Sequence, residues 1–287
     1  MKPFDYIVPT TLVEATDILA RYGAAARVIA GGTDVLVELR RDSENAPEVI
    51  VDISRVQGLR GVDLKQGMLA IKPLTTHAEI GASDLVRKLA PLLAVAASMI
   101  GSPQIRNRGT IGGNIMNAAA CADTVPPLLA LGTVLTLSSA SGTRQCRLEE
   151  FFVKPYKTIA RPDEVLTDIQ CAVLPMEARS TFLKLGRRNA VAIARLSVAA
   201  ILSRDGSGVI TDARIVPGAA FPTWKRVKEA ERILTGHQPS QILFAEAGIK
   251  VSECMIAATG RRWSTEYKEP VIPVLVRRAL ETCASQQ

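Results

Sequence analysis

The apolar positions of the first 58 residues follow helix and strand periods in turn. A capping box from Thr11 to Glu14 opens a helix whose apolar face runs to Gly23. Apolar runs of strand length lie on either side of it, and the second run ends at a Gly-Gly pair. This order predicts a small β-α-β-α-β unit with a glycine loop at the carboxyl end of a strand, where open α/β sheets commonly bind ligands. The predicted strands are 4–8, 27–30 and 49–53, and the predicted helices are 12–22 and 34–41.

Two further units follow along the chain. Residues 59–175 mix short strands with short helices, whereas residues 176–287 place three strands before their helices. A sheet followed by helices is typical of an α+β domain, and Thr223 is the predicted N-cap of its first helix. The sequence thus predicts three units, 1–58, 59–175 and 176–287. The strands predicted in the last two are 62–64, 69–71, 134–138, 144–148, 165–173, 182–185, 197–203 and 209–216, and the helices are 76–80, 84–89, 92–100, 125–131, 223–236, 239–258 and 271–283.

Two Gly-Gly sequences carry the most specific signal. The first ends the apolar run in VIAGGTD at Val28–Asp34, and the second, Gly112-Gly113, lies within QIRNRGTIGGNIMNAAACAD. Paired glycines let the backbone take positive φ and approach a ligand closely, and free amides at a helix start favour an anion. Together the loops suit a long ligand with a pyrophosphate in its middle. A glycine-rich turn leading into a buried helix is the alternative for each. Neither has the GxGxxG or GxxxxGK[ST] spacing, so a Rossmann or P-loop domain is a poor fit.

Composition and charge exclude several classes of function. The net charge is +7, but the basic residues are scattered and not interleaved with aromatics, so no nucleic acid is expected. Two histidines and five widely spaced cysteines predict no metal site in this chain and free thiols in a reducing compartment. We read His77 as a helix-start or surface residue and Cys121 as a space-filling one. Without a signal-like or membrane-length apolar run, a cytoplasmic location and no membrane span are expected.

Four ordered segments carry a resemblance to a known family. They are AGGTDVLVELR at Ala30–Arg40, SPQIRNRGTIGGNIMNAAACAD at Ser102–Asp123, FLKLGRRNAVAIARLSVAA at Phe182–Ala200, and ARIVPGAAFPTWKRVKEAERILTG at Ala213–Gly236. In this order they resemble the FAD-binding medium subunit of the molybdenum hydroxylases, the xanthine dehydrogenase and carbon monoxide dehydrogenase family. The resemblance covers essentially the whole chain. It implies an α+β protein, with a two-lobed FAD-binding domain of the p-cresol methylhydroxylase type at 1–58 and 59–175 and a C-terminal α+β domain at 176–287.

The resemblance also assigns cofactor-binding residues. The segment from Arg27 to Val35 matches the strand and loop that wrap the pyrophosphate, and Ile100 and Leu166 match apolar contacts to the cofactor rings. From the residues alone, Asp123 could bond sugar hydroxyls or cap the next helix. Lys184 matches a lysine near the flavin, where a cation would stabilise the anionic reduced ring, and a surface lysine on a strand is the alternative. The predicted set is Arg27, Val28, Ile29, Ala30, Gly31, Gly32, Thr33, Asp34, Val35, Ile100, Thr110, Gly113, Asn114, Met116, Asn117, Asp123, Leu166 and Lys184, with no catalytic residue and no metal ligand.

By this resemblance the chain is the FAD-binding electron-transfer subunit of a molybdenum-containing hydroxylase or dehydrogenase. A large molybdopterin subunit would oxidise the substrate, and a small [2Fe–2S] subunit would relay the electrons to FAD on this chain. The assembly would be a heterotrimer or its dimer. In the family, the loop on the side of the electron acceptor is more acidic than the matching segment of this chain, Arg188–Ile193. The acceptor is therefore left as NAD⁺ or another compound. Two alternatives stay open: a stand-alone FAD-dependent oxidase or reductase, and a structural subunit that has lost its flavin.

Overall fold

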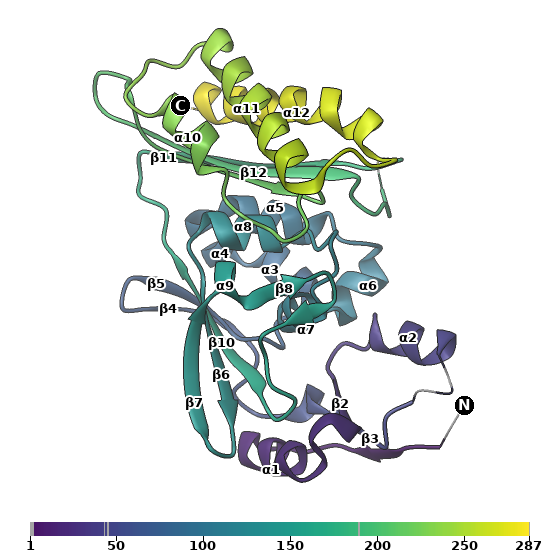
Figure 1. Cartoon of the computed structure of the whole chain (residues 1–287). Helices are drawn as coiled ribbons and strands as arrows, with labels where there is room; N and C mark the ends of the chain where they lie inside the picture. The colour runs from purple at the N-terminus through teal and green to yellow at the C-terminus, as the bar shows by residue number, and fades with distance from the viewer. Residues whose placement is uncertain (1–2, 43, 45, 189, 287) are drawn as a thin grey trace.

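Three larger sheets with their helices follow one another along the molecule, and the strands at 152–154 and 157–158 pair as a small fourth sheet (Figure 1). The computed structural model describes residues 3–42, 44, 46–188 and 190–286. The small N-terminal sheet lies at one end, the five-stranded sheet and its helices in the middle, and the C-terminal sheet at the other end (Figure 1). Among the described residues, no helix combines the length and the apolarity that crossing a bilayer requires. The mixed composition of helix and strand predicted from the sequence is confirmed.

The N-terminal unit is a parallel sheet of three strands in the order β1-β3-β2. Thr11 caps the first helix, because its hydroxyl accepts a hydrogen bond from the amide of Glu14 at 3.2 Å. The capping box is only half formed, since the Glu14 carboxylate accepts from the amide of Thr10 instead. Strand β2 ends directly before the first glycine loop, as predicted. The elements are β1 (Asp5–Ile7), α1 (Leu12–Tyr22), η1 (Gly23–Ala25), β2 (Ala26–Ile29), α2 (Val35–Arg41), β3 (Val49–Asp52) and η2 (Ile53–Arg55).

The middle unit is an antiparallel sheet in the order β4-β5-β10-β6-β7, with short helices packed against it. Two of these helices replace the long loop expected around the second Gly-Gly pair. Ser102 and Thr110 each accept a hydrogen bond from the amide three residues ahead and so begin a helix. The elements are β4 (Val62–Lys65), β5 (Met68–Ile71), α3 (His77–Ala82), α4 (Asp84–Leu89), α5 (Pro91–Ser98), α6 (Pro103–Arg108), α7 (Ile111–Asn117), α8 (Val125–Ala130), β6 (Val134–Ser139), β7 (Gly142–Arg147), α9 (Leu148–Phe151), β8 (Phe152–Lys154), β9 (Lys157–Thr158) and β10 (Val165–Ala172).

The C-terminal unit is an antiparallel sheet, β11-β12-β13, with α11 and α12 on one face and α5 and α8 of the middle unit on the other (Figure 1). The predicted N-cap Thr223 is wrong, because the helix begins after Val227. The last helix runs through Pro270 and Pro273, where the Ser252 hydroxyl bonds the Glu269 carbonyl that Pro273 cannot. The elements are β11 (Ala178–Leu185), β12 (Leu196–Arg204), β13 (Ile210–Gly218), α10 (Lys228–Leu234), α11 (Gln241–Thr259) and α12 (Thr265–Ser285).

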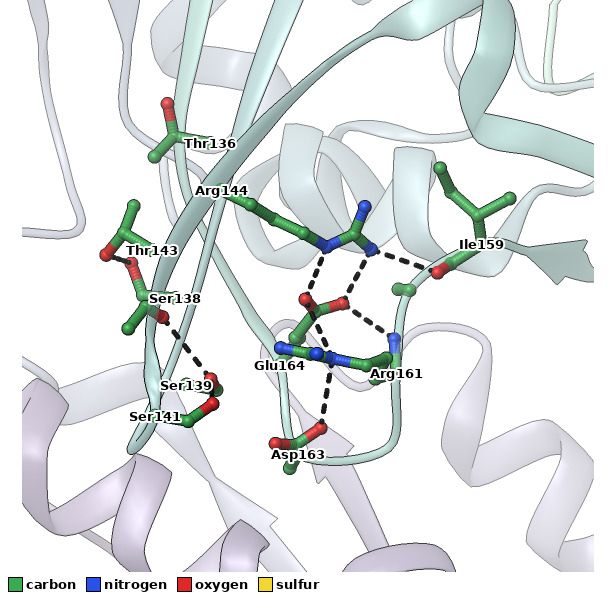
Figure 2. A network of polar contacts seen from close by, with 12 residues as sticks. Thr136, Ser138, Ser139, Ser141, Thr143, Arg144, Ile159, Arg161, Asp163 and Glu164 are labelled. Atoms are coloured by element: carbon green, nitrogen blue, oxygen red, sulfur yellow. Dashed lines mark hydrogen bonds and ion pairs between the residues drawn. The ribbon is translucent and has the colours of Figure 1, made fainter.

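A buried carboxylate ties the β6–β7 hairpin to the start of β10 (Figure 2). The Glu164 side chain is 1% exposed and accepts hydrogen bonds from Arg144 Nε and Nη2 at 2.6 and 2.9 Å. The Arg161 amide donates to the same carboxylate at 2.7 Å. Burial alone would raise the pKa of Glu164, but these hydrogen bonds outweigh burial and lower it. The charged carboxylate therefore stabilises the fold above its unfolded pKa, and that contribution is lost as the pH falls through its folded pKa.

Replacing Glu164 with glutamine should lower the free energy of unfolding by about 2–3 kcal/mol, because charge-assisted hydrogen bonds are lost. Arg144 keeps partial access to water, which limits the loss. Urea denaturation at pH 7 measures the change. Glu149→Gln is the matched control, since Glu149 pairs with Arg147 at 3.6 Å on the surface. The control should change the stability by less than about 0.5 kcal/mol. Equal effects of the two substitutions would contradict a structural role for the Glu164 cluster.

Candidate cofactor-binding site

The two glycine sequences meet in space, as the sequence predicts. A Cβ added to Gly31 would lie 2.1 Å from the Arg108 carbonyl oxygen and 3.0 Å from the Gly109 Cα. Thr110 follows Gly109 directly, so the first glycine loop touches the turn that begins α7. Only a residue without a side chain permits this backbone approach at Gly31. The loop of the N-terminal unit and the 108–110 turn therefore border one site.

The first loop presents backbone amides without protein partners. Gly32 has φ +76°, a left-handed conformation that glycine adopts readily. In the part of the chain that the structure describes, the amides of Gly32, Thr33 and Asp34 donate no hydrogen bond to the protein. All three residues keep some exposure to solvent. Free, accessible amides on successive residues form a concave surface that suits an anion.

The second Gly-Gly pair serves packing, which corrects the expectation of a positive-φ loop. Gly112 and Gly113 lie inside α7 and have ordinary helical backbones. The Gly112 amide donates to the Pro73 carbonyl at 2.9 Å, and the Gly113 amide donates to the Thr110 hydroxyl at 3.1 Å. A Cβ on Gly112 would lie 2.5 Å from the Pro73 Cβ. These glycines let α7 pack closely on residue 73, so their amides are not available to a ligand.

Asp123 and Lys184 form a buried ion pair between the middle and C-terminal units. Lys184 Nζ lies 2.6 Å from Asp123 Oδ2 and donates a second hydrogen bond to the Met99 carbonyl at 3.0 Å. The side chains are only 6% and 7% exposed, and Asp123 Oδ1 has no hydrogen-bond partner among the described residues. Burial raises the pKa of Asp123, although the Lys184 cation opposes that shift. A buried carboxylate oxygen without a donor is an acceptor that a ligand hydroxyl or amide could satisfy.

A large cavity lies between the 120–121 turn and the C-terminal unit, and neither Asp123 nor Lys184 is part of its wall. Its volume is about 830 Å³. Its walls combine cationic and aromatic groups, and the Arg195 guanidinium lies 4.3 Å from the centre of the Tyr267 ring. Cys121 is part of the wall, and burial and then the Asp123 carboxylate raise the pKa of its thiol. The Asp34 charge raises the pKa of the same thiol further.

The remaining predicted residues divide between contact positions and core positions. Arg27 pairs with Glu38 at 2.6 Å on the surface, while the Ile100 carbonyl accepts a hydrogen bond from Arg106. The Asn114 side-chain oxygen accepts from Thr124, which leaves its amide group free, and no bond of the Asn117 side chain is found among the described residues. Five predicted apolar contacts pack at least partly into hydrophobic cores: Val28, Ile29, Val35, Met116 and Leu166.

Two backbone groups contribute to the site and carry no signal in the sequence. The Met99 carbonyl orients Lys184, and the Arg108 carbonyl sets the contact with Gly31. Every residue has a backbone carbonyl, so its role depends only on where the fold places it. Arg106 fixes the turn that follows Met99, because its Nη1 donates hydrogen bonds to the carbonyls of Ile100 and Gly101 at 2.8 and 3.2 Å.

His77 lies beneath the 108–110 turn and is buried, so it is a helix-start residue but not a surface residue. Its amide donates to the Gly109 carbonyl at 3.0 Å, and its ring packs where a Cβ on Gly109 would be 3.2 Å away. Nδ1 has no hydrogen-bond partner among the described residues. Burial, and then the Arg106 cation, lower the pKa of His77 to about 4. The ring is therefore neutral at pH 7.

The His77 pKa predicts loss of stability in mild acid. The folded-state value of about 4 lies below the ordinary value of 6.5, so the unfolded chain binds the proton more readily. The contribution of the neutral His77 ring to the free energy of unfolding is therefore complete above pH 6.5. It decreases by about 2–3 kcal/mol as the pH falls toward 4. The measurement is the pH dependence of urea unfolding for wild type and His77→Gln. The difference between the two proteins should change across this window, and parallel curves would contradict the prediction.

The fold and the site together define a flavoprotein of the FAD-binding, two-lobed type. Residues 2–172 match the protein family described as "FAD binding domain in molybdopterin dehydrogenase". Residues 181–283 match the family described as "CO dehydrogenase flavoprotein C-terminal domain". The chain therefore belongs to the family of FAD-binding medium subunits of the molybdopterin dehydrogenases. The resemblance and the fold class predicted from the sequence are both confirmed.

Relatives of known activity span nearly the whole chain. It is 34% identical to the 6-hydroxypseudooxynicotine dehydrogenase complex subunit alpha of Paenarthrobacter nicotinovorans, over 98% of this chain and 95% of the relative. It is 32% identical to the nicotinate dehydrogenase FAD-subunit of Eubacterium barkeri, over 82% and 81%. A solved chain of reconstituted CO dehydrogenase from Oligotropha carboxidovorans superposes with a TM-score of 0.92 at 27% identity, covering 100% and 99% of the two chains.

Proposed function

We propose that this chain collects electrons on FAD from a partner [2Fe–2S] subunit and passes them to NAD⁺ or another acceptor. The large partner would carry molybdopterin and oxidise the organic substrate, in a heterotrimer or its dimer, in the cytoplasm. When bound, FAD supplies the redox chemistry that the side chains of this chain lack. The single observation that carries the proposal is the contact between Gly31 and the 108–110 turn, because it joins the two sequences expected to hold one dinucleotide.

The residues fit FAD in their chemistry. The free amides of Gly32, Thr33 and Asp34 would bind the pyrophosphate, as expected for consecutive unpaired N–H groups. Asp123 Oδ1, buried and without a donor, would accept a hydrogen bond from a cofactor hydroxyl. Lys184 would hold its positive charge beside the ring system, and Met99 fixes its direction. A cation there favours the more negative, reduced form of the cofactor.

The cavity that Cys121 lines is the proposed entry for the electron acceptor. Its wall places Arg195, Arg262 and Lys268 among the aromatic side chains of Tyr156 and Tyr267. Lys268 donates to the Ala219 carbonyl at 2.6 Å, and burial lowers its pKa. Cationic and aromatic groups together suit an anionic acceptor with a planar ring, which describes NAD⁺ and many other carriers.

The proposal is tested by the colour and the electron transfer of the purified chain. We expect the visible spectrum of oxidised flavin and the release of FAD on denaturation. A colourless chain that does not take up added FAD would favour the structural subunit without flavin. Turnover of an organic substrate by the isolated chain would favour the stand-alone oxidase or reductase. Rapid flavin reduction by the [2Fe–2S] subunit, with none by the substrate alone, is the outcome that the proposal requires.

A further inference from the structure

Four aromatic side chains stand in the wall of the cavity of about 830 Å³, and two of them present free ring faces. The rings of Phe221 and Tyr267 each have a cation over one face, at 4.9 and 4.3 Å from the ring centre. Trp263 and Tyr156 are 87% and 68% exposed, and no cation or second ring covers either of them among the described residues. An exposed ring in the wall of a cavity is free to stack on a planar group of a ligand.

The turn that carries Trp263 is closed by hydrogen bonds on both sides of this residue. The Arg262 amide donates to the Thr265 hydroxyl at 2.7 Å, and the Thr265 amide donates back to the Arg262 carbonyl at 2.9 Å. Arg262 Nε donates to the carbonyl of Thr259, the last residue of α11, at 2.9 Å. Trp263 is therefore held between α11 and α12 by its neighbours, although its own ring is exposed. A ring on a fixed turn loses little backbone freedom when a ligand binds.

Two residues of the same wall have strained backbones. Tyr156 and Ala219 have φ of +62° and +56°, a left-handed conformation that non-glycine residues rarely adopt. The Tyr156 amide donates to the Ala118 carbonyl at 2.9 Å, and the Ala219 carbonyl accepts from Lys268 Nζ at 2.6 Å. Such conformations persist only where the surroundings fix them, and they cluster at ligand-binding sites. The strain indicates that this wall is shaped for a ligand and not only for packing.

The cations of the wall have no carboxylate partners. Arg195, Arg262 and Lys268 line the cavity, and none of them forms an ion pair among the described residues. Burial lowers the pKa of Lys268, and the charges of Arg262 and then Arg195 lower it further. Glu266 is the one carboxylate among the described residues of the wall. Like charges gathered without partners destabilise a folded chain, and a ligand with two or more negative charges offsets that cost.

We propose that this cavity selects a phosphate-bearing electron acceptor whose planar ring stacks on Trp263 while Arg195 and Arg262 bind its phosphate groups. The inference rests on the proposed function, and it names the chemical class of the acceptor and the residues that recognise it. A guanidinium matches a phosphate in shape and charge. A ring stacked on an aromatic side chain adds affinity for many different planar rings. The acceptor is thereby narrowed to a nucleotide-like carrier.

Two other classes of acceptor fit this cavity less well. An uncharged quinone gains nothing from the three cations, and its binding would remove water from them without replacing it. A protein carrier is too large for a cavity of about 830 Å³, which is a volume typical of small-molecule sites. A small acceptor with phosphate groups and a planar ring uses both the charges and the exposed aromatic side chains.

The test uses the full chain loaded with FAD. NAD⁺ and NADP⁺ are the phosphate-bearing probes, and a short-chain ubiquinone is the uncharged probe. Trp263→Ala and Arg262→Gln should each raise the dissociation constant of the dinucleotide that binds wild type by about tenfold, as measured by titration calorimetry. Trp263→Phe should keep that constant within about threefold of wild type, because a stacking ring is retained.

The matched controls lie outside the wall of the cavity. Ile242→Ala removes an exposed apolar side chain on α11, and Arg261→Gln removes a surface cation that pairs with Glu269 at 2.6 Å. Each control should change the dissociation constant by less than about twofold. Retained FAD and a wild-type unfolding temperature show that a variant is folded.

Tryptophan fluorescence gives a readout that a purely structural role of Trp263 would not change. The chain has two tryptophans, and Trp224 is buried whereas Trp263 is exposed. A ring stacked on Trp263 should quench the tryptophan emission of wild type. Trp263→Ala retains only Trp224, so its emission should stay unchanged even when calorimetry shows that the dinucleotide has bound.

The outcomes separate the acceptor class from the proposed function. Weaker binding by Trp263→Ala and Arg262→Gln, recovery in Trp263→Phe and quenching in wild type support the acceptor class. Wild type that binds neither dinucleotide, or binds one without quenching and with unchanged affinity in both variants, overturns the acceptor class alone. Faster reoxidation of the flavin by the ubiquinone than by either dinucleotide also overturns it. A wild-type chain that holds FAD but accepts no electrons from the reduced [2Fe–2S] subunit overturns the proposed function itself.

Discussion

Replacing Gly31 with alanine is expected to weaken FAD binding by about 100-fold, which corresponds to roughly 2.7 kcal/mol. The added Cβ, whose position the backbone of residue 31 fixes, would lie 2.1 Å from the backbone carbonyl oxygen of Arg108. No side-chain rotation can relieve this overlap, so the first loop must move away from the 108–110 turn. The free amides of Gly32 to Asp34 would then lose their position relative to Asp123 and Lys184. Fluorescence titration of the flavin-free protein with FAD measures the loss.

Gly206→Ala is the control for the Gly31 substitution. A Cβ at Gly206 meets no atom within 4 Å, so this change should leave FAD affinity within about twofold of wild type. Circular dichroism and the urea midpoint show whether either variant has unfolded. A folded Gly31→Ala protein with wild-type FAD affinity would contradict the joining of the two loops in one binding site.

Replacing Lys184 with methionine should lower the free energy of unfolding of the flavin-free protein by about 3–5 kcal/mol, because it leaves the buried Asp123 carboxylate without its cation. The partners are 2.6 Å apart and 6% and 7% exposed. The double variant Lys184→Met with Asp123→Asn should recover part of the loss, since no uncompensated buried charge remains. Urea denaturation of wild type, Lys184→Met, Asp123→Asn and the double variant gives the coupling energy between the two side chains. Additive effects of the two substitutions would contradict a buried ion pair.

The Lys184→Met variant should also differ from wild type in its pH dependence. Burial already raises the pKa of Asp123, and removal of the opposing cation should raise it further. When the pKa of a carboxyl group is raised in the folded state, the free energy of unfolding of the protein decreases as the pH rises from the unfolded pKa of that group, near 3.9, to its folded pKa. The deficit of the variant should therefore be smaller at pH 4 than at pH 7. Lys250→Met removes a surface ion pair with Glu253 and should show neither effect.

Two sequence-based predictions of local structure were wrong, one at the candidate site and one in the last helix. The second Gly-Gly pair has the composition of a flexible loop, but Thr110 caps a helix over it and Pro73 requires the close approach. The final helix was predicted to start at residue 271, but it begins at Thr265 and so includes Pro270. The close approach of α7 depends on Pro73, which is far away in the sequence. Local preference cannot anticipate such a partner.

The sequence by itself determined most of the order of helices and strands, the α+β class, the family and the position of the first glycine loop at the end of a strand. These features follow from hydrophobic period, capping residues and glycine placement, which act within a few residues. Only the tertiary structure decided that Gly31 contacts Arg108, that Lys184 pairs with Asp123 and that His77 is buried beneath the site. The physical reason is that these contacts join backbone and side-chain groups distant along the chain, and their energies depend on distance and burial, which only the packed fold sets.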